Sequence, residues 1–119
     1  MILLTILGII NFTGFVIHLL FTPIWGWGGD LKQLKSQNRR AALTMNGMIT
    51  YLFGFFSVVN LLWAFGVLEI QKTLVISIIG FWVVRSILQL LYYRVREPLS
   101  LAFLGAFIFM IAGHIVILL

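Results

Sequence analysis

The chain has 119 residues, of which 62% are hydrophobic and 9% are charged, and its mean hydropathy is +1.15. A water-soluble domain of this size could not hide so much apolar surface, so the composition excludes a soluble enzyme or a soluble binding domain. The net charge of +5 does not indicate nucleic acid, because the loop charges flank long apolar segments and suit anionic lipid headgroups.

Four apolar stretches, at about residues 2–22, 41–66, 73–93 and 99–119, are long enough to cross a bilayer. The first has neither a basic segment before it nor a polar cleavage region after it, so we expect a retained helix. The second is long enough to tilt, and Pro98 can lie in the first turn of the fourth. The sequence therefore predicts a single all-α domain, an integral membrane bundle of four transmembrane helices.

The breaks between these stretches predict the topology. The first break, residues 23–29, is rich in glycine, so we expect a flexible surface loop that leads to a short basic turn. The first and third loops share one side of the membrane and carry most of the basic residues: Lys32, Lys35, Arg39, Arg40, Arg94 and Arg96. The other side has only Lys72, so we expect both termini to be non-cytoplasmic and the first and third loops to be cytoplasmic. A bacterial inner membrane is the expected location, and an organelle membrane would fit the same topology.

Aromatic residues flank the two basic loops. They are Trp25, Trp27, Tyr92 and Tyr93. Amphipathic rings prefer the headgroup level of a bilayer, so these residues support the same span boundaries.

Arg85 is the strongest candidate for a functional residue, because a charged side chain inside hydrocarbon is costly. Gln89 lies one turn further along the same face. This pair could hold a carboxylate or phosphate as an anion or headgroup site. A structural hydrogen-bond clamp, or a long side chain that reaches the interface, is the somewhat favoured interpretation. All three acidic residues lie in loops, so the sequence offers Arg85 only a carbonyl, an amide, water, lipid or a ligand as partner.

Two further helices carry polar faces. On the second, Asn46, Thr50, Ser57 and Asn60 fall on one face, and on the first Asn11, Gly14 and His18 do so. Helix packing is the favoured interpretation of both faces, and a substrate path is the alternative. Because His18, Asn46, Arg85 and Gln89 all map to the cytoplasmic half, we expect them to gather into one polar pocket.

The two histidines do not suggest a shared haem. His18 and His114 lie toward opposite membrane faces, separated by about 15 Å along the helix axes, which is too far for two ligands of one iron. The sequence also lacks a paired-carboxylate motif, a nucleophile, base and acid set, and a zinc-type cluster. No metal and no cofactor is therefore predicted.

Three short motifs stand out in the chain: Arg85-x-x-x-Gln89-x-x-Tyr92-Tyr93, Pro98 with Phe103-x-Gly105, and Arg39-Arg40-Ala41 at the start of the second helix. In these motifs the chain resembles the MAPEG family of four-helix membrane glutathione transferases and their relatives. The resemblance implies trimers with sites between subunits near the cytoplasmic face, and contacts to glutathione from Arg39 or Arg40, Arg85, and Tyr92 or Tyr93. The chain departs from the family in two places: Thr44-Met45-Asn46-Gly47 lacks the glutamate of that turn, and Ser100 replaces a frequent arginine.

The leading functional hypothesis is a non-catalytic membrane subunit or a binding module for lipid or a small molecule. Its polar faces would pack within a homo-oligomer or a larger complex, with membrane lipids as further partners. The alternative is a MAPEG-like enzyme that uses glutathione or a related anionic thiol on a lipophilic substrate. A transporter is the third possibility, although the first helix lacks the embedded glutamate of small multidrug exporters.

Overall fold

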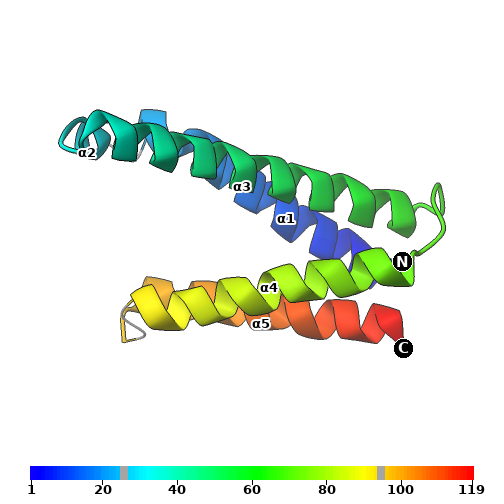
Figure 1. Ribbon diagram of the computed structural model, residues 1–119. Coiled ribbons are helices and arrows are strands. Elements are labelled where there is room, and N and C mark those ends of the chain that lie inside the picture. The colour runs from blue at the N-terminus through cyan, green and yellow to red at the C-terminus, as the bar shows by residue number, and fades with distance from the viewer. Residues whose placement is uncertain (25–26, 94–95) are drawn as a thin grey trace.

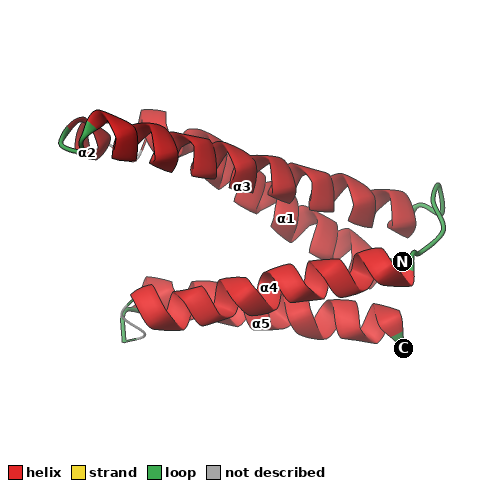
Figure 2. Ribbon diagram, in the orientation of Figure 1, coloured by secondary structure: helices red, strands yellow, loops and turns green. Residues whose placement is uncertain are grey.

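The structure is a computed structural model that describes residues 1–24, 27–93 and 96–119. Its helices are α1 (Ile2–Ile24), α2 (Trp27–Lys32), α3 (Ser36–Ala64), α4 (Lys72–Tyr92) and α5 (Pro98–Leu118). Trp25 and Arg94, which the sequence analysis assigned to the basic loops, lie outside the described residues, and so does the side chain of Trp27. Figure 2 shows that helices joined by short connections make up the described chain.

The prediction of an all-α fold with four membrane-length helices is confirmed. Each of α1, α3, α4 and α5 contains a segment long and apolar enough to cross a membrane. Side chains on their outer surfaces are apolar, and several of the most deeply buried side chains are polar, including Asn11, Asn60 and His114. A water-soluble protein has the opposite distribution. The chain is therefore a membrane protein.

The prediction of a loop over residues 23–29 is wrong for the described part of that segment. Helix α1 includes Pro23, and the short helix α2 begins at Trp27. Asp30 in the first turn of α2 and Lys32 in its last turn both complement the helix dipole. Leu31 is buried and fixes α2 against the rest of the protein.

Helix α3 begins at Ser36, five residues before the predicted start at Ala41. Arg39 and Arg40 therefore lie in its first turns rather than in a loop. Glutamine, arginine and alanine are good helix formers, so the helix begins before the first apolar residue of the stretch. Its other end is a glycine-capped turn: Gly66 has φ 68°, and the Val67 N–H donates to the Leu62 carbonyl at 2.9 Å.

The four long helices form two pairs that diverge as a wedge (Figure 1). Helix α1 packs along α3, and α4 packs along α5. The pairs meet at the end that holds both termini and the α3–α4 connection, and they separate toward the end that holds α2 and the α4–α5 connection. We call these the closed end and the open end of the wedge.

Small residues allow close helix packing toward the closed end. A Cβ on Gly113 of α5 would lie 2.8 Å from Leu7 Cδ2 on α1, and a Cβ on Gly8 would lie 2.9 Å from Leu61 Cδ2 on α3. Leu7 and Met110 are completely buried here. The two pairs are therefore joined by tight contact at one end, which leaves the space at the other end for a cavity.

Candidate functional site: a cavity between the helix pairs

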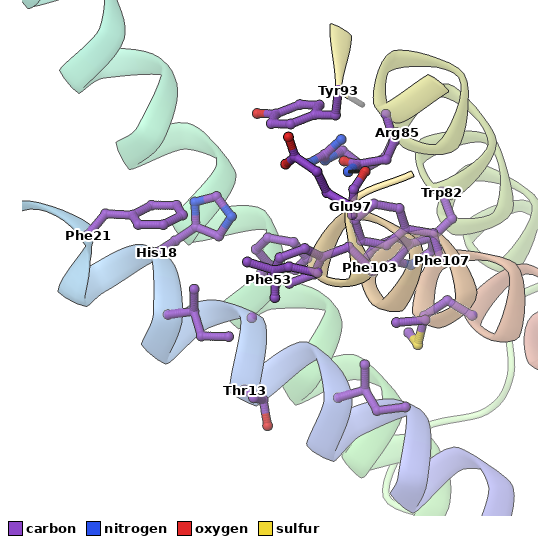
Figure 3. Close-up of a pocket in the computed structure, with 18 residues that line it drawn as sticks. Thr13, His18, Phe21, Phe53, Trp82, Arg85, Tyr93, Glu97, Phe103 and Phe107 are labelled. Atoms are coloured by element: carbon purple, nitrogen blue, oxygen red, sulfur yellow. Dashed lines mark hydrogen bonds between the residues drawn. The ribbon is translucent and has the colours of Figure 1, made fainter. Parts of the chain in front are cut away.

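A cavity of about 500 Å³ lies between the two helix pairs. Its walls come from α1, α3, α4 and α5, together with Tyr93 and Glu97 of the α4–α5 connection. Most of the lining is apolar: Ile10, Ile17, Phe21, Phe53, Trp82, Leu99, Phe103, Ala106, Phe107 and Met110. Arg85, Tyr93 and Glu97 lie together on one side of the cavity, whereas His18 and Thr13 lie on α1 (Figure 3). A largely apolar pocket with a few convergent polar groups is the usual form of a small-molecule site.

Arg85 on α4 provides a positive charge in this cavity. Its Cζ atom lies 4.8 Å from the centre of the Phe107 ring and 5.7 Å from that of the Tyr93 ring. Contacts of this kind attract a guanidinium to the ring faces. Within the described residues, its N–H groups form no hydrogen bond or ion pair. The charge is thus positioned by aromatic rings, while its hydrogen-bonding groups remain available.

Two nearly buried side chains beside Arg85 have polar atoms without partners. Gln89 is 2% exposed, and its Nε2 donates to Ser100 Oγ at 2.9 Å. The Gln89 Oε1 acceptor and the Trp82 Nε1 donor have no partner in the described structure. Buried polar atoms are nearly always paired. Both residues line the cavity, but the two atoms are themselves buried, so a bound molecule would supply the missing donor and acceptor only once these side chains turned toward it.

His18 lies on the opposite wall from Arg85 (Figure 3), and Asn46 orients it. Asn46 Nδ2 donates to the His18 carbonyl at 3.0 Å, so the Asn46 Oδ1 atom faces His18 Nδ1 at 2.9 Å. An amide oxygen only accepts, so Nδ1 carries the proton. In the neutral ring Nε2 is then an acceptor, and it has no hydrogen-bond partner among the described side chains.

Glu97 is the acidic residue of the cavity. It is the N-cap residue of α5, but its side chain does not cap the helix. Figure 3 shows its carboxylate on the same side of the cavity as Tyr93 and Arg85. Across the described ranges it forms no ion pair with Arg85. The cavity thus contains one cationic and one anionic side chain that are not joined to each other.

The structure places the sequence-predicted ligand residues in two groups. Those that line the cavity are His18, Arg85, Gln89 and Tyr93. Asn46 does not line the cavity but is hydrogen-bonded to His18, which does. Arg39, Arg40 and Tyr92 do not line the cavity either. His18, Arg85 and Gln89 thus line one cavity, but its walls are mainly apolar and Asn46 does not line it, so the predicted polar pocket of four residues is not what the structure contains.

Helix α5 and the loop before it contribute cavity-lining residues that were not predicted from the sequence. Glu97, Ser100, Phe103, Phe107 and Met110 all line the cavity. Their spacing of three, three, four and three residues puts them on one face of a helix, which is a signal that the sequence contained. Trp82, one turn before Arg85, was missed as well.

A second polar cluster lies toward the closed end. His114 Nε2 is 3.2 Å from Asn60 Oδ1, and His114 Nδ1 is 2.7 Å from the Met110 carbonyl. Ser57 Oγ donates to the Gly8 carbonyl at 2.9 Å, which joins α3 to α1. The polar face predicted on α3 thus packs against helices of the same chain. Gly14 packs against Phe53, while the buried Asn11 and Thr50 bond to backbone carbonyls of their own helices.

The two histidines therefore belong to separate clusters. Across the described segments, no three side chains of the metal-binding types lie together.

Comparisons with protein-family models, with curated proteins and with solved structures find no match for this chain.

Proposed function

We propose that this membrane protein binds an amphiphilic lipid or small molecule in the cavity between its helix pairs. Arg85 would hold a phosphate or carboxylate of the headgroup, and the apolar walls would hold a hydrocarbon chain. The observation that carries this proposal is that, among the described residues, the Arg85 guanidinium and the nearby Gln89 Oε1 and Trp82 Nε1 atoms have no hydrogen-bond partner. An exposed arginine would be solvated by water, but one held in a membrane cavity needs an anionic or polar partner.

Binding accounts for these side chains better than catalysis does. The Ser100 hydroxyl accepts a hydrogen bond from Gln89, and no base contacts it in the described structure. His18 lies on the opposite wall and is hydrogen-bonded to Asn46. A hydroxyl nucleophile needs a base within hydrogen-bonding reach. The cavity groups therefore suit recognition of a headgroup.

Arg85→Gln is expected to weaken binding of a single-chain phospholipid at least tenfold, because loss of one charged hydrogen-bond donor costs about 1.5–3 kcal/mol. The measurement is a titration of detergent-purified protein with lysophosphatidylglycerol and lysophosphatidylethanolamine, followed by native mass spectrometry. Wild-type protein should bind one probe molecule per chain. Lys35→Gln removes an equal charge at an exposed position outside the cavity and should leave binding unchanged. Equal affinities of Arg85→Gln and wild type would refute the proposal.

The MAPEG-like enzyme remains the alternative proposal, because Arg85 and Tyr93 both line the cavity. It requires glutathione to bind there. Isothermal titration with glutathione separates the two proposals. Saturable heat that disappears in Arg85→Gln would support the enzyme, whereas the lipid-binding proposal expects no specific heat.

We further propose that the open end of the wedge faces the cytoplasm of a bacterial inner membrane, as the basic residues near it indicate. The chain has no native cysteine, so single introduced cysteines report the topology. In intact cells a membrane-impermeant maleimide should label Leu68→Cys in the α3–α4 connection and should not label Gln33→Cys before α3. The reverse pattern would invert the orientation. Assembly into an oligomer also remains a proposal. The polar face of α3 packs within the same chain, so it does not supply the interface.

A further inference from the structure

We infer that the preferred headgroup is zwitterionic, with a phosphate and a cationic amine, as in an ethanolamine phospholipid. This inference rests on the proposed function and makes it more specific. It arises from Glu97, which shares the cavity with Arg85 without forming an ion pair with it in the described part of the chain.

The charges of the cavity favour such a headgroup over a purely anionic one. Arg85 and Glu97 bring one positive and one negative charge to the lining. A headgroup that carries only a phosphate would gain the attraction of Arg85 but would also meet the Glu97 carboxylate. A phosphate and an amine on the same headgroup would complement both side chains, so like charges would not be brought together.

The neutral polar atoms without partners in the cavity favour the same headgroup. Gln89 Oε1 is an acceptor without a donor, and Trp82 Nε1 is a donor without an acceptor. A protonated amine has three N–H donors, so one can bond to Glu97 and another to Gln89. Phosphate and ester oxygens can accept from Arg85 and from Trp82. A phosphate and amine headgroup thus supplies both the donor that Gln89 Oε1 lacks and the acceptor that Trp82 Nε1 lacks.

The Glu97 carboxylate is available to bind an amine because of its position in the chain. Glu97 precedes Pro98 at the start of α5, and no side-chain hydrogen bond ties it to the end of the helix. It is exposed on the protein surface, so its attraction to an amine is partly screened by water. We therefore expect Glu97 to set a preference among headgroups, while Arg85 provides most of the affinity.

Three lysophospholipids with the same acyl chain test the inference: lysophosphatidylethanolamine, its N-acetylated derivative and lysophosphatidylglycerol. Wild-type protein should bind the first about threefold to fivefold more tightly than the other two. The N-acetylated derivative keeps the phosphate but loses the amine charge, so it should bind like lysophosphatidylglycerol. This comparison uses unmodified protein and does not depend on the folding of any variant.

Glu97→Gln should abolish the preference, because it removes the attraction of the carboxylate for the ethanolamine probe and its repulsion of the two anionic probes. Glu69→Gln, which removes an acidic residue in the α3–α4 connection, should keep the preference. Equal binding of the three probes by wild type, with all three weakened by Arg85→Gln, would overturn the zwitterion inference and leave the proposed function intact. If no probe bound saturably, the proposed function itself would fail.

Discussion

Replacement of Gly113 by valine is expected to lower the apparent free energy of unfolding by about 3 kcal/mol. A Cβ at this position would lie 2.8 Å from Leu7 Cδ2 and 3.2 Å from Leu7 Cδ1. Leu7 is completely buried, so it cannot move away without displacing its own neighbours. Valine adds two further methyl groups, and α1 and α5 would have to separate at the closed end of the wedge.

The measurement is far-UV circular dichroism of the protein in micelles during titration with a denaturing detergent. Gly105→Val is the matched control, because a Cβ on Gly105 in the same helix has no neighbouring atom within 4 Å. We expect its effect to stay within about 0.5 kcal/mol. Adding Leu7→Ala to Gly113→Val should restore part of the lost stability by making room. If the two valine variants unfolded at the same detergent concentration, the close contact between α1 and α5 would be contradicted.

The number of spans could be predicted from sequence because long apolar runs dominate the energetics of a membrane chain. The helix ends could not be predicted as well. Ser36–Arg40 is polar, so hydropathy placed it in a loop, although its residues form helices readily. The segment Trp27–Lys32 was misread because two glycines suggested a turn, while the charges of Asp30 and Lys32 suit a short helix.

The site was partly predictable because helical spacing reports which residues share a face. Arg85 and Gln89 are one turn apart, and both line the cavity. The rings that hold Arg85 were not predictable in this way. Phe107 belongs to another helix, and its position depends on how α4 packs against α5. Glu97 was read as a loop charge, since no local pattern shows that it lines the cavity.

His114→Leu is expected to lower the apparent free energy of unfolding by about 2 kcal/mol. His114 Nε2 faces Asn60 Oδ1 on α3 at 3.2 Å, and both side chains are completely buried. It is the one side-chain contact at hydrogen-bonding distance that the described residues form between the α1–α3 pair and the α4–α5 pair. Because Nδ1 also faces the Met110 carbonyl at 2.7 Å, the ring donates to both oxygens only when both of its nitrogens are protonated. Leucine fills a similar volume but leaves the Asn60 acceptor without a partner, which costs about 1–3 kcal/mol.

A double-mutant cycle with Asn60→Leu separates the hydrogen bond from the packing. Removing both partners leaves no unpaired acceptor, so the double variant should be more stable than the sum of the single losses predicts, by about 1 kcal/mol. Ser77→Ala is the control, because the exposed Ser77 hydroxyl bonds only to the Thr73 carbonyl of its own helix. Additive losses at Asn60 and His114 would mean that the two side chains do not interact. The closed end of the wedge would then be held by the apolar contacts around Leu7 and Gly113 alone.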